Sequence, residues 1–318
     1  MIRAGTLSVI IPAYNEEANI PLATKAISDT LTDAGISYRL LFVDDGSSDE
    51  TWSAISACAA ESPYVAGLHF SRNFGKESAI YAGICNADTE CCAVIDADLQ
   101  HPVEKLVEMY HLWSQGFDVI EGIKTDRGRE SSVHRGASRS FYKMIGRLTG
   151  LELQNTSDFK LMDQEVATII SHLPERNTFF RAMSFWVGFR TTQVEYEVQE
   201  RVSGTSKWST WKLVRYAMNN IASFSSFPMQ IVTWLGALSI LFSAIFGVIS
   251  FVQKLMGVAL GGFTTVILLV VFIGGIIMLS LGVIGFYIAK IYSEVQHRPR
   301  FIISEECGVH SENRQRVG

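Results

Sequence analysis

Two long apolar stretches near the C-terminal end constrain this 318-residue chain more than any other feature. Pro228–Val252 and Phe263–Ala289 contain no Asp, Glu, Lys or Arg. Each is longer than the roughly 20 residues that an α-helix needs to cross the hydrocarbon core of a bilayer. A core helix of a soluble protein with this length and without a single charge would be very unusual. The sequence therefore predicts a two-helix transmembrane hairpin, which we place at residues 228–290.

The charges around this hairpin predict its orientation. Three cations precede the first stretch and three follow the second: Lys207, Lys212, Arg215, Lys290, Arg298 and Arg300. The connecting segment, Gln253–Gly262, contains a single charged residue, Lys254. Because positively charged flanks favour the cytoplasmic side, both ends of the hairpin are expected to face the cytoplasm. We expect a multi-pass protein of the inner (plasma) membrane.

An amphipathic segment precedes the hairpin. In Ser209–Phe224 the apolar residues recur at helical spacing, with cations and amides between them. Such a helix suits the membrane interface, and we place an interfacial helix at residues 209–227. Packing against a globular core is the alternative. After the hairpin, residues 291–318 form a polar cytosolic tail, which we expect to be mobile from about Ser304.

The N-terminal two thirds alternate between strand and helix patterns. Short apolar runs typical of buried strands are Leu7–Ile11, Tyr38–Val43, Val65–Phe70 and Cys91–Ile95. Segments with helical periodicity separate them, which predicts a mostly parallel sheet with helices on both faces. The net charge of −5 gives no indication of a nucleic-acid partner. The five cysteines lack metal-ligand spacing and fit a reducing compartment.

A polar segment follows each of these strands at its carboxyl end. In sheets of this kind, ligands bind at the carboxyl ends of the strands. The polar segments are Pro12–Glu16, Asp44–Ser47, Ser71–Gly75 and Asp96–Gln100. Asp96 and Asp98 can reach one small volume, and their oxygens suit Mg²⁺ or Mn²⁺. The alternative is a solvated acidic turn. The Gly-x-Gly-x-x-Gly of dinucleotide-binding proteins is absent after the first strand.

Four ordered motifs carry a family resemblance: PAYNEE at 12–17, VDDGSSD at 43–49, SRNFGKESAIYAG at 71–83 and DADLQHP at 96–102. They resemble family-two inverting glycosyltransferases, and more closely the polyprenyl-phosphate type, which includes dolichol-phosphate mannose synthases and bacterial undecaprenyl-phosphate glucosyltransferases. The resemblance covers about residues 5–210. It implies an α/β, GT-A-like nucleotide-binding domain, which we place at residues 1–208.

The resemblance implies a set of residues that bind the donor nucleotide sugar. They are Pro12, Tyr14, Glu16, Asp44, Asp45, Asp96, Ala97, Lys124, Arg201 and Lys207. Tyr14 would stack on the base, with Pro12 shaping the turn beneath it. Glu16 and Asp44 or Asp45 would accept hydrogen bonds from ribose hydroxyls or a base N–H. Turn formation and helix capping are the alternative for the two aspartates.

The metal and the reacting centre are assigned in the same way. Asp96, Asp98 and Gln100 would hold Mg²⁺ or Mn²⁺ and, through it, the donor diphosphate. Asp158, in the segment from Asn155 to Leu161, matches an acidic motif that precedes a short strand, and would lie near the sugar C1. The alternatives for Asp158 are an N-cap or a salt bridge with Lys160. His101 is expected to have a structural or supporting role.

The acceptor is assigned to a basic helix predicted at Val133–Leu148. The family resemblance makes Arg135, Ser138 and Arg139 candidates for the acceptor phosphate, although a basic helix face is usually only solvated. We therefore expect transfer of a hexose, with glucose from UDP-glucose as the first choice, to undecaprenyl phosphate. A homo-oligomer, including a tetramer, is compatible with the resemblance.

Other functions remain open. A GDP-mannose-dependent mannose synthase differs only in the donor. A polysaccharide synthase is disfavoured because such enzymes usually carry a Gln-x-x-Arg-Trp motif, which is absent, and more membrane spans. A non-catalytic membrane scaffold is disfavoured by the intact acidic motif, and a transport protein by spans that lack charged residues.

Overall fold

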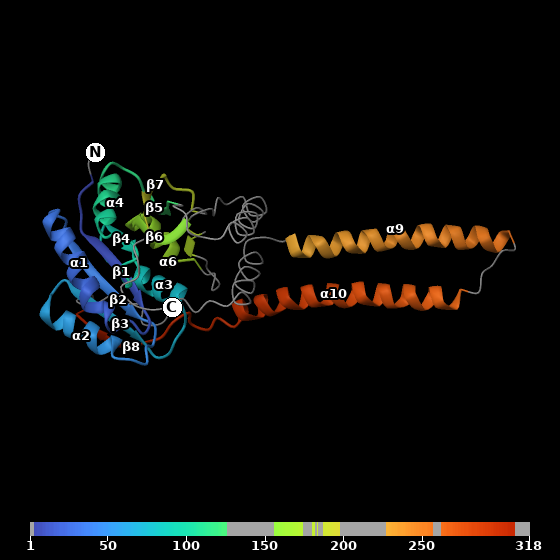
Figure 1. The fold of residues 1–318 in the computed structure, drawn as a ribbon, viewed down its shortest axis with the longest axis horizontal. Coiled ribbons are helices and arrows are strands. Elements are labelled where there is room, and N and C mark those ends of the chain that lie inside the picture. The colour runs from blue at the N-terminus through green and yellow to red at the C-terminus, as the bar shows by residue number, and fades with distance from the viewer. Residues whose placement is uncertain are drawn as a thin grey trace. The chain divides into compact units, whose positions relative to one another are not determined.

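A computed structural model describes residues 3–125, 156–173, 180–181, 183, 187–197, 227–256 and 262–308. The chain forms two compact units (Figure 1). The first comprises residues 1–208 together with 299–318, and the second comprises residues 209–298. The first unit is therefore built from two separate stretches of sequence.

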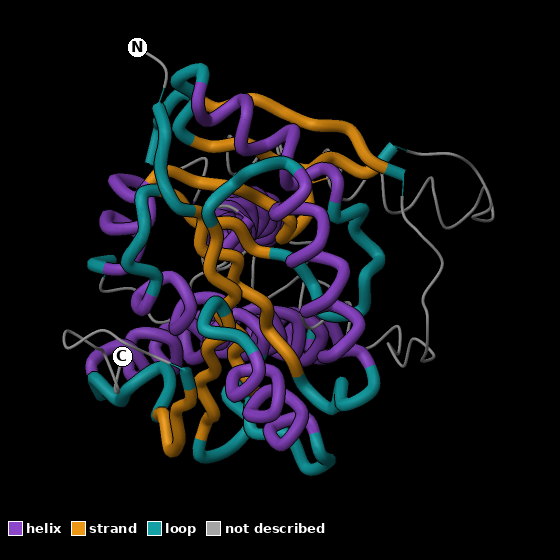
Figure 2. Tube along the Cα trace, turned by 90° about the vertical axis from the view of Figure 1, so that its left-hand side faces the viewer, coloured by secondary structure: helices purple, strands orange, loops and turns teal. Residues whose placement is uncertain are grey.

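The first unit is organised around an eight-stranded mixed sheet in its described part. Its strands are β1 (Leu7–Ala13), β2 (Tyr38–Asp44), β3 (Val65–Phe70), β4 (Cys91–Val94), β5 (Val119–Lys124), β6 (Thr156–Asp163), β7 (Thr191–Tyr196) and β8 (Ile303–Cys307). Their order across the sheet is β7-β5-β6-β4-β1-β2-β3-β8. In Figure 2 the strands run between helices that lie on either side.

Helices cover both faces of this sheet. They are α1 (Asn19–Asp33), α2 (Thr51–Glu61), α3 (Lys76–Asn86), α4 (Glu104–Ser114) and α6 (Gln164–Ser171). One apolar core forms between the sheet and α1, α2 and α4, and a second between the sheet and α3 and α6. Successive β1 residues point to opposite faces, so Val9 belongs to the first core and Ile10 to the second. This explains why the β1 run is apolar throughout.

The strand order creates a switch point beside β1. β1 pairs in parallel with β2 on one side and with β4 on the other. Because the chain winds outward in opposite directions from this point, the loops after β1 and β4 lie where ligands bind in open α/β sheets. The polar segments named above follow β1, β2, β3 and β4.

The predicted mostly parallel sheet with helices on both faces is confirmed. Two antiparallel strands complete it, since β6 lies between β4 and β5, and β8 pairs with β3. The expectation of a mobile tail from Ser304 was wrong for Ile303–Cys307. This segment is polar, but its backbone pairs with the edge strand β3, and the Ile303 side chain is buried.

The second unit contains two long helices, α9 (Phe227–Leu255) and α10 (Phe263–Val295). Val232–Gln253 and Leu269–Val295, with mean hydropathies of 2.3 and 2.6, are long and apolar enough to cross a membrane. Their apolar side chains are largely exposed rather than packed inside protein. The helices match the predicted hairpin segments. Residues 209–226 of the expected interfacial helix lie outside the described residues.

Candidate functional site

The acidic loop after β4 contacts a cation from α3. The Lys76 Nζ lies 2.6 Å from Asp96 Oδ1. Two residues further on, Asp98 Oδ1 accepts a hydrogen bond of 3.2 Å from the Gln100 backbone N–H. Leu99, between them, has a left-handed φ of 54°. The loop therefore turns sharply and keeps Asp96 and Asp98 in one short segment at the switch point.

Lys76 joins this loop to β6. It is the first residue of α3, directly after Gly75, whose φ of 98° is a conformation that L side chains rarely adopt. The Lys76 Nζ also lies 2.9 Å from Asp158 Oδ2. Burial alone would lower the pKa of Lys76, but Asp96 and Asp158 outweigh it and raise the pKa above its usual range. Lys76 is therefore a permanent cation between two carboxylates.

Asp158 is buried in β6 and held by a second cation. Arg181 donates to both of its oxygens, with Nε–Oδ1 at 2.7 Å and Nη2–Oδ2 at 3.0 Å. Burial would raise the pKa of Asp158, but Lys76 and Arg181 together hold it well below its usual range. The acidic motif lies within β6 rather than before a strand, as the sequence analysis had it.

A buried ion pair holds the backbone of Arg181 in place. Lys160 and Glu121 are opposite each other on β6 and β5, are fully buried, and form a salt bridge. The Lys160 Nζ also donates to the Arg181 carbonyl at 3.0 Å. Lys160 lies on the same face of β6 as Asp158, but its salt bridge is with Glu121, and the cations that contact Asp158 are Lys76 and Arg181. Lys160 instead fixes the backbone of the residue that holds Asp158.

Glu77 adds a third carboxyl group next to this cluster. Its Oε2 accepts a hydrogen bond of 3.0 Å from the Phe180 N–H. Burial, together with the nearby charge of Asp158, raises the pKa of Glu77 to about 7. Glu77 thereby ties the start of α3 to the segment that carries Arg181.

The loops after β1 and β2 are held together by Asp44. This fully buried carboxylate accepts from the Ser47 N–H and hydroxyl through Oδ1, and contacts His69 Nδ1 through Oδ2. The Ser47 hydroxyl in turn accepts from the Asn15 N–H at 2.9 Å. Tyr14, next to Asn15, is 48% exposed. An exposed aromatic ring at this edge is suited to stacking on a base.

Asp45 holds the loop after β3. It accepts hydrogen bonds from the Phe74 and Gly75 N–H groups, at 2.6 Å and 2.9 Å at the shortest. Burial raises its pKa to about 6, against the effect of those two donors. Gly46 has a φ of 65°, and a Cβ there would lie 2.4 Å from the Arg72 carbonyl carbon. Only glycine permits this close approach of the two loops.

The remaining predicted residues occupy varied positions. Pro12 is in β1, and Ala97 is buried in the acidic loop. Glu16 lies after β1 and accepts from Asn19 through Oε2. Lys124 is exposed at the end of β5. Arg135, Ser138, Arg139, Arg201 and Lys207 lie outside the described residues.

His101 has a packing role, as the sequence analysis favoured. Its ring stacks on Phe159, with centroids 4.9 Å apart, and meets the edge of Tyr196 at 5.2 Å. Burial lowers the pKa of His101, which favours the neutral ring.

The acidic loop fits a hard divalent cation that a substrate helps to hold. Within the described ranges, no three His, Cys, Asp or Glu side chains gather closely enough to bind a metal by themselves. Mg²⁺ and similar ions, however, are commonly bound by one or two carboxylates together with substrate phosphates. Asp96 and Asp98 provide such oxygens, and the contact between Asp96 and Lys76 shows that the loop accommodates a cation.

Comparison with known proteins decides the family. Glycosyl transferase family 2 matches residues 8–189, more than half of the chain. The chain belongs to glycosyl transferase family 2. As a glycosyltransferase it is an enzyme, and its acidic loop and Asp158 both lie inside the matched region.

Curated relatives of this glycosyltransferase match over nearly the whole chain. The bactoprenol glucosyl transferase of Shigella phage SfV is 36% identical over 94% of this chain and 98% of its own length. The prophage bactoprenol glucosyl transferase homolog of Escherichia coli K12 is 35% identical over 93% of this chain and 98% of its own. These matches include the region of α9 and α10.

Among solved structures, glucosyl-3-phosphoglycerate synthase from Mycobacterium tuberculosis, in complex with Mn²⁺, UDP and glucosyl-3-phosphoglycerate, is similar to the glycosyltransferase at 21% identity. The match covers 69% of this chain and 80% of that chain, with a TM-score of 0.46. Similarity this distant bears on neither substrate nor mechanism.

Sequence reasoning missed three residues of this site: Lys76, Arg181 and His69. Lys76 lies in a quoted motif, and a cation directly after a glycine at a helix start was a usable signal. Arg181 and His69 are far in sequence from their aspartate partners and lie in no recognisable pattern. Only the folded sheet shows that they meet Asp158 and Asp44.

Proposed function

We propose that this enzyme transfers a hexose, with glucose as the first choice, from UDP-glucose to the phosphate of a membrane polyprenyl phosphate such as undecaprenyl phosphate. The observation that carries the proposal is the full-length similarity to proteins named bactoprenol glucosyl transferase. The similarity extends through both apolar helices, so the part that would reach a lipid acceptor is shared as well as the glycosyltransferase domain.

The Asp158 cluster supports direct displacement by an acceptor that needs no strong base. A carboxylate with a depressed pKa and two cationic partners is a poor proton acceptor. A phosphate monoester, with its second pKa near 6, is already largely ionised at neutral pH. In this mechanism the acceptor oxygen attacks C1, the nucleoside diphosphate leaves, and the anomeric centre inverts. Asp158, already paired with two cations, would orient the reactants rather than remove a proton.

Leaving-group stabilisation falls to the cations around the acidic loop. Asp96 and Asp98, with Gln100, would hold Mg²⁺ or Mn²⁺, which would offset the charge that develops on the diphosphate. Lys76 forms salt bridges with both Asp96 and Asp158 and lies at the start of α3, where backbone N–H groups favour anions. We also assign Arg201 and Lys207 to the diphosphate, and Tyr14 to the base.

The acceptor side follows from the membrane. A polyprenyl phosphate is confined to the bilayer, whereas a nucleotide sugar is soluble. We assign the acceptor phosphate to Arg135, Ser138 and Arg139, and propose that α9 and α10 span the inner membrane with the enzyme domain in the cytoplasm. We also propose a homo-oligomer.

Metal-dependent nucleotide binding tests whether the site is catalytic. Mn²⁺ and then UDP are titrated into the full-length protein in detergent by isothermal calorimetry. Binding of UDP that requires Mn²⁺ is expected. Absence of nucleotide binding with either Mn²⁺ or Mg²⁺ would favour a non-catalytic scaffold. Preference for GDP over UDP in the same assay would instead favour a GDP-mannose-dependent enzyme.

A further inference from the structure

The segment after α10 is part of the core of the first unit. Phe301 is fully buried and stacks on Phe70, with ring centroids 5.5 Å apart. The Arg300 guanidinium lies 3.9 Å from the centre of the Tyr81 ring, and its Nη2 donates to the Leu173 carbonyl at 2.7 Å. Strand β8 then pairs with β3. Residues that follow the second apolar helix therefore complete the glycosyltransferase domain.

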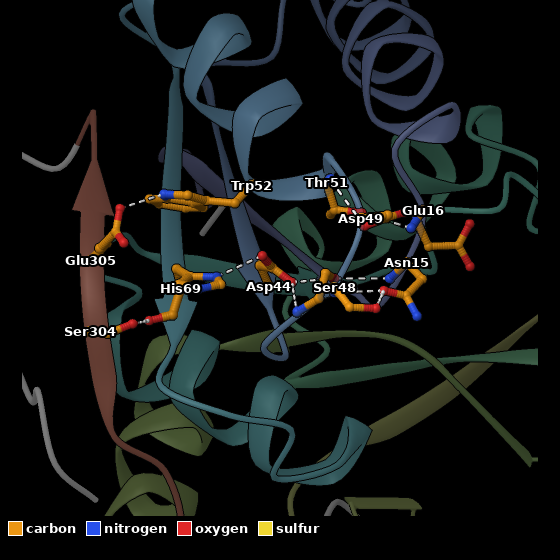
Figure 3. A network of polar contacts seen from close by, with 11 residues as sticks. Asn15, Glu16, Asp44, Ser48, Asp49, Thr51, Trp52, His69, Ser304 and Glu305 are labelled. Atoms are coloured by element: carbon orange, nitrogen blue, oxygen red, sulfur yellow. Dashed lines mark hydrogen bonds and ion pairs between the residues drawn. The ribbon is translucent and has the colours of Figure 1, made fainter.

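Strand β8 fixes His69 in two ways (Figure 3). The Ser304 hydroxyl donates to the His69 carbonyl at 3.1 Å. Glu305 Oε2 accepts from the Trp52 indole N–H at 2.8 Å, and the Trp52 ring stacks on the His69 ring with centroids 5.2 Å apart. The backbone of His69 is thus held by one β8 residue, and the ring by a tryptophan that the next β8 residue orients.

The other side of His69 faces Asp44. The His69 Nδ1 lies 2.7 Å from Asp44 Oδ2, and it must be the donor because a carboxylate offers only lone pairs. Asp44 is fully buried, so a lost donor cannot be replaced by bulk water. Ser47 occupies the other oxygen, Oδ1. His69 is therefore the contact that orients Asp44 from the β3 side.

A series of hydrogen bonds connects Asp44 to Asn15, the residue next to the exposed Tyr14. Ser47 accepts from the Asn15 N–H, and Asn15 Oδ1 accepts from the Ser48 N–H at 2.9 Å. Asn15 has a left-handed φ of 55°, a conformation that asparagine adopts more readily than most non-glycine residues. Figure 3 shows this series of side chains running from β8 to Asn15. Tyr14 directly precedes Asn15 and is exposed.

We propose that His69, held by strand β8, is a positioning residue for the nucleotide half of the donor site. By orienting Asp44 it orders the Tyr14–Asn15 turn that receives the base. The inference rests on the proposed function, because it assumes that a nucleotide binds at this edge. It assigns a role in donor binding to the chain that follows the second membrane helix.

The test measures UDP affinity in the presence of Mn²⁺ by calorimetry on the full-length protein in detergent. His69→Ala should weaken UDP binding by about tenfold, as expected when a buried carboxylate loses a donor. His69→Asn should restore most of the affinity, because its amide nitrogen can replace Nδ1. His111→Ala, which removes an exposed histidine from α4, is the matched control and should leave the affinity unchanged.

Strand β8 is tested separately through Glu305→Ala, which alters an exposed side chain and leaves the core intact. It should weaken UDP binding in the same direction as His69→Ala. In steady-state assays both variants should raise the donor KM, with kcat and the acceptor KM near wild type. The melting temperature of Glu305→Ala should match wild type, whereas that of His69→Ala should fall because the buried Asp44 loses a donor.

Two results would overturn the inference while the proposed function stands. One is equal UDP affinity of wild type and His69→Ala, and the other is a loss that His69→Asn does not recover. If wild type itself binds no UDP with Mn²⁺, the proposed function fails instead, so the two failures are distinguishable.

Discussion

At the scale of single residues, the site is a set of carboxylates, each held by a different partner. Asp96 and Asp158 share Lys76, and Asp158 is gripped further by Arg181. Asp44 and Asp45 are buried and hold loops rather than pointing into open space. Among the described residues of the site, Tyr14, Glu16, Lys76, Lys124 and the acidic loop are accessible to a ligand.

Asp98→Asn tests the assigned metal ligand. The substitution keeps the size of the side chain but removes its charge, so metal-dependent UDP binding should weaken and turnover should fall by orders of magnitude. The measurements are UDP calorimetry with Mn²⁺ and the rate of sugar transfer. Asp88→Asn, at an exposed salt bridge with Arg39, is the control and should behave as wild type. Near-normal turnover of Asp98→Asn at ordinary Mg²⁺ would refute the ligand role.

The dependence of the transfer rate on pH should show no step from ionisation of Asp158. Its pKa lies well below the usual value, so it stays ionised across the working range and its protonation is approached only in strong acid. The ratio of wild-type to Asp158→Asn rates should therefore be large and constant between pH 6 and pH 9. A ratio that falls toward acid with a midpoint near pH 6 would show that Asp158 acts as a base with a raised pKa.

At the scale of elements, β5 and β6 position Asp158 through a buried ion pair. Lys160→Met leaves the Glu121 carboxylate buried without its cation and removes the donor to Arg181. Loss of one partner of such a pair costs about 3–5 kcal/mol, so the melting temperature in detergent should fall clearly. Adding Glu121→Leu should recover much of that loss. Equal melting temperatures of the single and double variants would contradict this account.

The loops after β2 and β3 should respond to pH through Asp45. Its pKa is about 6 in the folded protein and near 4 in an unfolded chain. The folded state therefore binds this proton more tightly, and the contribution to stability grows as the pH falls from about 6 to about 4. The wild-type melting temperature minus that of Asp45→Asn should increase between pH 7.5 and pH 5. If this difference in melting temperature instead decreased from pH 7.5 to pH 5, the pKa of Asp45 would not be raised by folding.

Much of the arrangement of elements could be predicted from sequence, because apolar runs and helical spacing are local. Leu7–Ile11 and the two uncharged stretches are examples. The antiparallel β8 could not, because Ile303–Cys307 is mostly polar and its partner β3 is far away in the sequence. The same reason explains the site: Asp96 and Asp98 lie in a recognisable motif, whereas Arg181 and His69 act across the fold.

At the scale of the whole molecule, the glycosyltransferase domain is assembled from residues that precede α9 and residues that follow α10 in the sequence. If α9 and α10 both cross the membrane, the N-terminal domain and β8 must lie on one side of it. The pairing of β3 with β8 and the expected cytoplasmic orientation of both flanks therefore agree.

Thiol labelling in intact cells tests this topology. In a background without the natural cysteines, a cysteine at Gly261 should react with an impermeant maleimide from outside, and one at Ser311 should not. After the cells are broken open, both should react. Protection of both positions in intact cells would argue against two complete spans.

The central claim is transfer of a hexose to a polyprenyl phosphate, and a donor panel tests it most directly. The purified enzyme is given undecaprenyl phosphate and Mg²⁺ with UDP-glucose, UDP-galactose, UDP-N-acetylglucosamine or GDP-mannose in turn, and the lipid product is followed by mass spectrometry. The account predicts a hexosyl phosphoundecaprenol from UDP-glucose and none with Asp98→Asn. A lipid product from GDP-mannose alone would correct the donor, and no lipid-linked sugar from any donor would contradict the claim.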